Sequence, residues 1–306
     1  MKKRSVFIFI LIAAVTVLLF AATVFAAGGS SEKAINAECA AAASAAAKLL
    51  AKPDGALRLV SYNLLADLPG FGGTDAAERA PYAEAFLRDM DADILCLQEV
   101  SPAWFSCLRR PGIMFTAVQP VRTVLLMKMN VIMYNESTVR LIKSGTVQFT
   151  AGNDTRTRFA VWAVFEQKAN GRKYAVINCH FNLIRNDGDG GNMLSAANQT
   201  NELCLLANGL SEQYNCTVIA AGDFNCRERK TKTDSTYIYA RLTSYFTDAR
   251  EIAGTVFSGA QKSLASTSGD HIFLSGGARV YGYYILAFPH SELISDHFAA
   301  AADFFQ

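Results

Sequence analysis

The sequence predicts an α/β fold, and three observations lead to that expectation. A chain of 306 residues with 51% hydrophobic content can bury a sizeable core, as one large domain or two small ones. Between residues 57 and 100, two apolar runs of strand length flank a segment with helical periodicity. Residues 131–182 are rich in branched and aromatic side chains and contain a hairpin turn. Strands that alternate with a helix and continue as hairpins indicate a layered α/β protein.

The N-terminal end has the pattern of a bacterial export signal. The basic stretch Lys2-Lys3-Arg4 precedes an apolar run over residues 6–27, and V-F-A at residues 24–26 is similar to a cleavage site. We therefore expect residues 1–27 to be a signal peptide. Because the run is long enough to cross a bilayer, an uncleaved anchor is the alternative. Either outcome places the remaining chain outside the cytoplasm, secreted or membrane-anchored.

Composition sets further limits on the mature chain. Residues 28–55 are an alanine-rich spacer or helix, and the globular domain is expected over residues 56–306. Removal of the three N-terminal basic residues takes the net charge from +2 to −1, which gives no overall basic excess to attract a polyanion. The seven cysteines leave at least one unpaired in a monomer, and none is spaced as C-x-x-C, which argues against zinc.

The first elements of the domain end in polar residues. Residues 57–65 (LRLVSYNLL) predict a strand with Asn63 near its end, and residues 74–90 predict a helix. Residues 93–100 (DILCLQEV) predict a buried strand that ends at Glu99. Sites in layered α/β folds collect at the carboxyl ends of strands, so Asn63 and Glu99 are candidate site residues.

The middle of the chain predicts a set of paired strands. They are expected over residues 131–134, 138–149 and 158–167. A turn at residues 169–171 (A-N-G) leads into a further strand, 173–182. Alternation along that strand places Asn178, His180 and Asn182 on one face. His180 is therefore a candidate site residue, with a histidine satisfied by a nearby carbonyl as the alternative.

The stretch around which the chain is organised is 216–225, CTVIAAGDFN. After a predicted helix over residues 193–213, it forms a short apolar run that stops at Gly222. Glycine permits a tight turn, so Asp223 and Asn225 are expected to emerge together at the end of a buried strand. An Asp beside an Asn offers acceptors for a metal or water and a donor for a phosphate oxygen. The alternative is a simple Asx turn.

The C-terminal part supplies further strand ends. A helix with a loop is expected over residues 237–253, and strands over 270–275, 280–286 and 298–304. Asp270 opens the first of these strands, and Asp296-His297 precedes the last.

Taken together, the motifs resemble the endonuclease/exonuclease/phosphatase superfamily. The matching stretches are SYNLL at 61–65, LQEV at 97–100, NCHFN at 178–182, GDFN at 222–225, DHIF at 270–273 and SDH at 295–297. That group includes pancreatic-type deoxyribonucleases, abasic-site endonucleases, neutral sphingomyelinases and inositol polyphosphate 5-phosphatases. The resemblance covers residues 56–306 and implies a four-layered α/β sandwich, with two mostly antiparallel β-sheets packed face to face and helices outside.

The resemblance also implies catalytic roles. Asp223 would orient or deprotonate the attacking water, and Asp270 would pair with His297 to fix its tautomer. His180 would donate to a phosphate oxygen or to the leaving group, and Asn225 would hold the phosphate. Whether Asp223 or His297 takes the proton is left open by the sequence.

A divalent metal is expected beside these groups. Glu99 is a hard oxygen ligand suited to Mg²⁺, with Mn²⁺ or Ca²⁺ as alternatives, and Asn63 would bind beside it. Asp296 is a candidate for a second metal or for support of the first. Family members often contact phosphate through an arginine or tyrosine of the central strands, and Arg158 is the candidate here, with Arg156 as its rival.

The sequence therefore predicts an exported Mg²⁺-dependent phosphodiesterase, nuclease-like, with DNA or RNA as a candidate substrate and the substrate identity left open. A basic cluster follows the GDFN motif, at Arg227, Arg229, Lys230 and Lys232. The alternatives are a phosphomonoesterase, a sphingomyelinase-type lipid hydrolase with an aromatic edge around Tyr281–Phe288, and a catalytically silent binding module. No protein partner is expected, and membrane contact is expected only through an uncleaved N-terminal segment.

Overall fold

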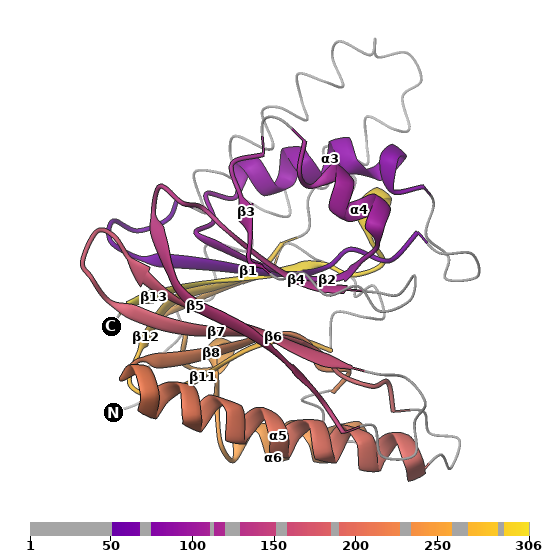
Figure 1. The fold of residues 1–306 in the computed structure, drawn as a ribbon, viewed down its shortest axis with the longest axis vertical. Helices are drawn as coiled ribbons and strands as arrows, with labels where there is room; N and C mark the ends of the chain where they lie inside the picture. The colour runs from indigo at the N-terminus through magenta and orange to yellow at the C-terminus, as the bar shows by residue number, and fades with distance from the viewer. Residues whose placement is uncertain are drawn as a thin grey trace, which may run out of the picture. The chain divides into compact units, whose positions relative to one another are not determined.

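Two β-sheets lie face to face in the computed structural model of the chain (Figure 1). The chain divides into the units Met1–Ala51 and Lys52–Gln306, and the fold is that of the second. The structure describes residues 51–67, 75–110, 113–119, 129–150, 158–184, 190–226, 234–258, 269–286 and 291–305. The predicted signal or anchor therefore lies outside the described residues. None of the described helices is both long and apolar enough to span a bilayer.

The first sheet has seven strands within the described residues, in the order β10-β12-β13-β1-β2-β4-β3. They are β1 Leu57–Asn63, β2 Ile94–Val100, β3 Thr116–Ala117, β4 Met129–Tyr134, β10 Thr255–Ser258, β12 Arg279–Leu286 and β13 Ala299–Phe305. The second sheet has six, in the order β5-β6-β7-β8-β11-β9. They are β5 Val139–Gln148, β6 Phe159–Gln167, β7 Lys173–His180, β8 Thr217–Asp223, β9 Thr247–Asp248 and β11 Asp270–Ser275.

Helices cover the outer faces of both sheets (Figure 1). The helices α3 Ala76–Asp89 and α4 Pro102–Cys107 lie over the first sheet, and α5 Gly190–Tyr214 and α6 Asp234–Thr243 over the second. Two short helices, α7 Ala249–Ile252 and α8 Ser291–Ile294, lie in connections. Neighbouring strands are antiparallel except in the pairs β1–β2, β10–β12 and β7–β8. The predicted four-layered α/β sandwich is confirmed.

Strand direction brings the polar strand ends to one edge. The parallel pair β1–β2 aligns Asn63 with Gln98, and the parallel pair β7–β8 aligns His180 with Asp223. Strand β11 runs antiparallel to β8, so its first residue, Asp270, pairs with Asp223. Strand β13 likewise begins beside the end of β1, since the two are antiparallel.

Side chains alternate between the two faces of a strand, and this alternation places the polar side chains at the strand ends on the face that lies toward the other sheet. On β1, Leu57 and Leu59 lie in the inter-sheet core, and Asn63 continues the same face. On β8, Ala221 leads to Asp223 in the same way. The apolar stripes that hold the sheets together therefore end in polar side chains at the edge of the core, and burial of the stripe fixes the register that delivers them.

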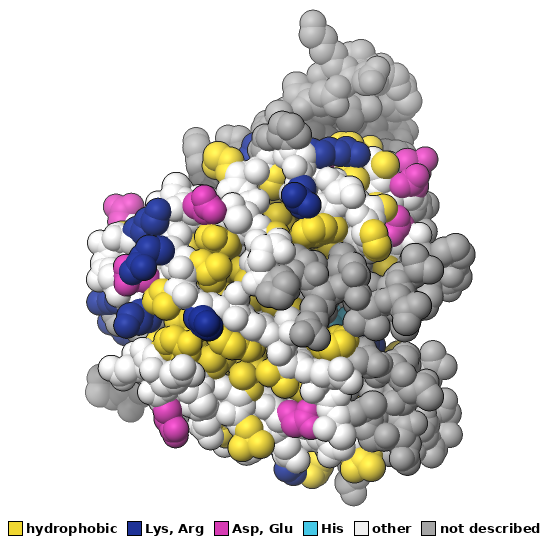
Figure 2. All heavy atoms as spheres, in the orientation of Figure 1, with side chains coloured by type: hydrophobic (Ala, Val, Ile, Leu, Met, Phe, Trp, Pro, Cys, Tyr) yellow, Lys and Arg dark blue, Asp and Glu magenta, His cyan; other side chains and the backbone are white. Residues whose placement is uncertain are grey.

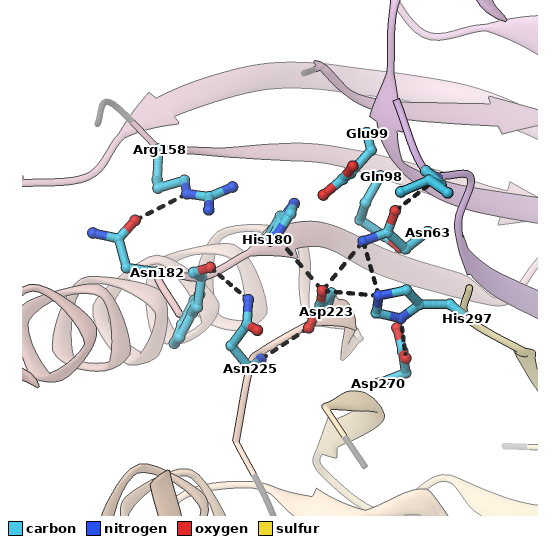
Figure 3. Close-up of polar contacts among 12 residues, drawn as sticks. Asn63, Gln98, Glu99, Arg158, His180, Asn182, Asp223, Asn225, Asp270 and His297 are labelled. Atoms are coloured by element: carbon cyan, nitrogen blue, oxygen red, sulfur yellow. Dashed lines mark hydrogen bonds and ion pairs between the residues drawn. The ribbon is translucent and has the colours of Figure 1, made fainter. Parts of the chain in front are cut away.

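Glu99 departs from this alternation. In a regular strand Cys96 and Gln98 face the other sheet and Glu99 faces away. The pairing of β2 with β4 shifts register between Leu97 and Val100, and Glu99 has a φ of 57°. A bulge of this kind re-aims a side chain, and it brings the Glu99 carboxylate into the same space as Asn63 (Figure 3).

Gly222 serves a different purpose from the one expected. Strand β8 continues through it to Asp223, so the chain turns after Asp223 rather than at the glycine. Its φ is +146°, and a Cβ there would lie 1.9 Å from the carbonyl oxygen of Cys179. Glycine is required because β7 and β8 approach closely just before the site.

The structure contains short elements that the sequence did not predict. They are β3, β9, β10, α4 and α8. The expected helix over residues 237–253 is divided into α6, the two-residue strand β9 and α7.

The six cysteines within the described residues are all free. Tyr283 and Tyr284 are buried in the first sheet, which supports strand packing at these two positions, whereas Tyr281 is exposed and Phe288 lies outside the described residues.

Candidate active site

Asp223 is the centre of the site (Figure 3). It is 3% exposed, and its Oδ1 accepts a hydrogen bond of 3.0 Å from the backbone N–H of Asn225. Its Oδ2 accepts a bond of 3.2 Å from Asn63 Nδ2 and lies 3.5 Å from His180 Nε2 and 3.8 Å from His297 Nε2. One carboxylate oxygen thus faces nitrogens from β1, β7 and the segment before β13.

Asp270 and His297 form the pair that the sequence predicts. Nδ1 of His297 lies 2.7 Å from Oδ2 of Asp270. Burial raises the pKa of Asp270 to about 6, although His297 pulls it down. Burial acts to lower the pKa of His297, but the charge and hydrogen bond of Asp270, with the charges of Asp223 and Asp296, raise it to about 10. His297 is thus the more basic partner of the pair, and its Nε2 lies 3.8 Å from Oδ2 of Asp223.

Asn63 and Glu99 form the oxygen-rich side of the site. The amide of Asn63 is oriented by Leu65, whose backbone N–H donates to Oδ1 at 3.0 Å. The carboxylate of Glu99, 7% exposed, accepts a bond of 3.0 Å at Oε2 from the backbone N–H of Ala66. The loop that follows β1 therefore orients both side chains.

These oxygens fit a divalent cation. Mg²⁺ takes oxygen ligands, keeps several waters and needs few protein carboxylates, and Glu99 with the amide oxygen of Asn63 supplies that donor set. Asp223, Asp270 and His297 also offer ligand atoms within 4.8 Å of one another. Because Nδ1 of His297 is already bound to Oδ2 of Asp270 at 2.7 Å, that trio suits proton and phosphate chemistry better than metal binding.

The opposite side of the site carries groups suited to phosphate. Asn225 has a φ of 50°, a conformation that Asn tolerates, and its Nδ2 donates to the carbonyl of Phe181 at 2.9 Å. Arg158 donates from Nε to Oδ1 of Asn182 at 2.9 Å, and His180 lies between Arg158 and Asp223 (Figure 3). An arginine oriented by a side-chain amide presents its guanidinium to an anion.

The structure thus brings eight of the predicted site residues to one edge of the sandwich. They are Asn63, Glu99, Arg158, His180, Asp223, Asn225, Asp270 and His297. Asp296 is less closely associated, because its side chain is 59% exposed and its Oδ1 lies 4.0 Å from Nε2 of His297. Arg156 and the basic cluster after GDFN lie outside the described residues.

A buried amide pair behind the site was not predicted. Nε2 of Gln98 donates to Oδ1 of Asn178 at 2.8 Å, which joins the two sheets. Nδ2 of Asn178 donates in turn to the carbonyls of Leu97 and Val131 at 2.9 Å. Alternation had placed Asn178 on the same face as His180, and a fully buried amide on that face signals an inter-sheet hydrogen bond.

Solved structures resemble this fold along most of the chain. An endonuclease/exonuclease/phosphatase from Bacteroides vulgatus is 21% identical, with 82% of this chain and 99% of that chain covered and a TM-score of 0.67. A mannosyl-6-phosphatase from Bacteroides thetaiotaomicron is 20% identical (82% and 100% covered, TM-score 0.62). A D. rerio TDP2 complexed with a single-strand DNA product is 17% identical (83% and 100% covered, TM-score 0.60). At these identities the likeness concerns the fold.

Comparison of the sequence with known proteins and with family models identifies the family of the chain. No curated protein matches the chain. The model of the endonuclease/exonuclease/phosphatase family matches residues 60–297, and this range encloses every residue from Asn63 to His297 in the site described above. The chain therefore belongs to the endonuclease/exonuclease/phosphatase family and has the fold of its phosphoesterases.

Proposed function

We propose that the chain is an exported phosphoric ester hydrolase that requires Mg²⁺ and cleaves phosphodiester bonds by attack of an activated water. The observation that carries this proposal is the convergence of Asn63, His180 and His297 on one carboxylate oxygen of Asp223. A carboxylate surrounded by nitrogen donors, at the edge of a buried layer, is suited to orient a water beside a phosphate.

Each residue has a role that follows from its contacts. Asp223 orients the water and accepts its proton, while Asn63 holds the carboxylate in place. His297, held by Asp270, donates from Nε2 to a phosphoryl oxygen as negative charge develops there. His180 donates from the neighbouring strand to the phosphate or the leaving oxygen. Asn225 and Arg158 bind the remaining phosphate oxygens.

Glu99 and Asn63 would hold the cation, with Asp296 at the rim of the site. When bound, Mg²⁺ would withdraw charge from a phosphoryl oxygen and so assist hydrolysis. The fit rests on two oxygen donors that the loop after β1 has already oriented. Mn²⁺ takes similar oxygen ligands and is a useful probe of the same site.

A phosphodiester is the substrate class we favour. The basic cluster at residues 227–232 follows the GDFN motif directly in the sequence, and a run of cationic residues there favours a nucleic-acid backbone. On the face of the described residues seen in Figure 2, basic and acidic side chains are interspersed, so that cluster would have to supply the local positive charge. TDP2 bound to a DNA product has this fold, as does a mannosyl-6-phosphatase, so monoesters are the second candidate class.

The test is hydrolysis by the purified full-length chain, first with Mg²⁺ and then with EDTA. A matched pair, bis(p-nitrophenyl) phosphate and p-nitrophenyl phosphate, separates diester from monoester chemistry. Double-stranded DNA, RNA, sphingomyelin, an inositol polyphosphate and mannose 6-phosphate then identify the class. We expect Mg²⁺-dependent cleavage of the diester and of a nucleic acid. Cleavage of monoesters alone would assign a phosphatase, and metal binding without hydrolysis would favour a binding module.

A further inference from the structure

A buried arginine on α3 joins the two sides of the site from behind. Arg79 is 4% exposed, and its guanidinium donates to three backbone carbonyls. Nη1 donates to Leu64 O at 2.9 Å and to Ile294 O at 2.8 Å, and Nη2 donates to Leu65 O at 2.6 Å. The first and third of these carbonyls lie just after β1, and the second lies at the end of α8, more than two hundred residues later in the chain.

The carbonyls after β1 belong to the loop that orients the oxygen side of the site. Within this loop, Leu65 N–H donates to the amide oxygen of Asn63, and Ala66 N–H donates to the carboxylate of Glu99. Leu65 has a φ of 53°, which a branched residue adopts only when its surroundings hold it there. Arg79 supplies part of that restraint by binding the carbonyls on both sides of the Leu65 N–H group.

The carbonyl of Ile294 belongs to the segment that carries His297. Ser295 follows Ile294 directly, and its Oγ donates to the carbonyl of Asn63 at 2.6 Å. The same Oγ accepts a bond of 3.1 Å from the backbone N–H of His297. Links through Ser295 and through Arg79 therefore connect the end of β1 to the histidine segment, in addition to the contact of 3.4 Å between Asn63 Nδ2 and His297 Nε2.

Only arginine can make this set of contacts. Its planar guanidinium presents five N–H donors in a fixed geometry, while a lysine has one flexible ammonium. Trp104 on α4 supports the group from one face, with its ring 4.9 Å from the guanidinium carbon, and its Nε1–H also donates to Leu65 O at 3.2 Å. Backbone carbonyls, an aromatic face and burial together fix the position of the cation.

We propose that Arg79 is a positioning residue that sets the spacing between the oxygen ligands Asn63 and Glu99 and the catalytic His297. The inference rests on the function proposed above and deepens it. Arg79 binds backbone carbonyls of both segments and would act through the two segments that it holds together. Its loss should therefore loosen both sides of the site at once.

The test compares Arg79→Lys and Arg79→Met with wild-type protein. We expect the affinity for Mn²⁺ alone, measured by titration calorimetry, to fall by about 10- to 100-fold, the usual effect of losing an outer-shell partner. We expect kcat to fall over a similar range and KM to change little. Amide exchange at Leu65, Ala66 and His297 should become faster. Guanidinium ion added to Arg79→Ala should restore part of kcat.

Two controls separate positioning from general destabilisation. Arg58 on β1 is also buried, at 2% exposure, and binds the Met90 carbonyl and Asp303 at the far end of the strand. Arg58→Lys should lower stability without changing Mn²⁺ affinity, kcat or exchange at the three amides. If Arg79→Met does not fold, Trp104→Phe, which removes the bond to Leu65 O and part of the ring that faces Arg79, should shift the same readouts in the same direction by less.

The outcomes distinguish this inference from the function it rests on. Wild-type affinity, kcat and amide exchange in folded Arg79→Lys and Trp104→Phe would overturn the role of Arg79. Equal effects in Arg58→Lys and Arg79→Lys would also overturn it, because they would indicate a stability effect. A wild-type protein that binds Mn²⁺ but hydrolyses nothing would refute the proposed hydrolysis, while the affinity and exchange measurements would still decide the role of Arg79.

Discussion

Asp223 is the residue on which most of the proposed chemistry depends. Replacing it with Asn keeps the shape and the acceptor at Oδ1 but removes the charge and places an N–H group where water should be oriented. We predict that Asp223→Asn lowers kcat by about 10²- to 10⁴-fold, the usual contribution of general base catalysis. Circular dichroism should show an unchanged fold. Activity within a few-fold of wild type would remove Asp223 from its role.

Glu99 provides a separate test of the metal assignment. We predict that Glu99→Gln weakens Mg²⁺ binding by more than about 100-fold, because even outer-shell partners are worth about 10- to 100-fold. A ligand at 100 times its Kd stabilises a protein by about 2.7 kcal/mol, so Mg²⁺ should raise the Tm of wild type and EDTA should reverse the increase. Glu99→Gln should lack this shift. A variant that still responds to Mg²⁺ would place the cation elsewhere, for example at Asp223 and Asp270.

The strand ends recognised in the sequence identified most of the site residues, but they did not show which way every side chain points. Asn63, His180 and Asp223 could be placed because alternation and strand direction follow from sequence. The inward position of Glu99 could not, since it depends on a bulge in the pairing with β4. Arg79 was missed because it occupies the buried face of α3, among alanines and Phe86, where a charged residue is unusual. The position of Arg79 on the buried face of the predicted helix was the one sign in the sequence that this arginine has a special role.

At the scale of elements, the close approach of β7 and β8 sets the distance between His180 and Asp223. We predict that Gly222→Ala destabilises the fold by at least about 2 kcal/mol, because strain of about 1–3 kcal/mol at its positive φ adds to a clash with the Cys179 carbonyl. The two strands would separate at the site, so kcat should fall as well. Urea unfolding and steady-state kinetics measure the two effects.

Gly209 on α5 is the matched control for this substitution. A Cβ at Gly209 meets nothing within 4 Å, so Gly209→Ala should stabilise the protein by about 0.5–1 kcal/mol without changing kcat. Equal stability changes for the two alanine variants would show that the contact between β7 and β8 is not tight.

Long strands and helices could be predicted from sequence, whereas short elements could not. Strand β8 and helix α5 each contain enough residues for burial or periodicity to be recognised. Strands of two residues, such as β3 and β9, contain no pattern, because they form only where a neighbouring strand supplies partners. The pairing of the two sheets also came from the resemblance to a family rather than from periodicity, since alternation identifies a buried face but not what covers it.

At the scale of the whole molecule, the buried thiols report on cooperative unfolding. Cys96, Cys179 and Cys226 are buried, and burial raises the pKa of all three. Burial raises the pKa of the half-buried Cys204 to about 11. Because a thiol reacts as its thiolate, native protein should react slowly at Cys204 and not at the buried positions.

We predict that these thiols become reactive together, at the urea concentration where circular dichroism shows unfolding. The two inner layers share one fold, so no buried thiol should be exposed before the rest. The measurement is best made in a Cys39→Ser background, which removes the cysteine outside the described residues, with Cys204→Ser added to remove the native signal.

Reductant should leave the Tm unchanged, because the described cysteines are free. A thiol that reacts at lower urea would identify a part of the sandwich that opens by itself, and a Tm lowered by reductant would reveal a disulfide.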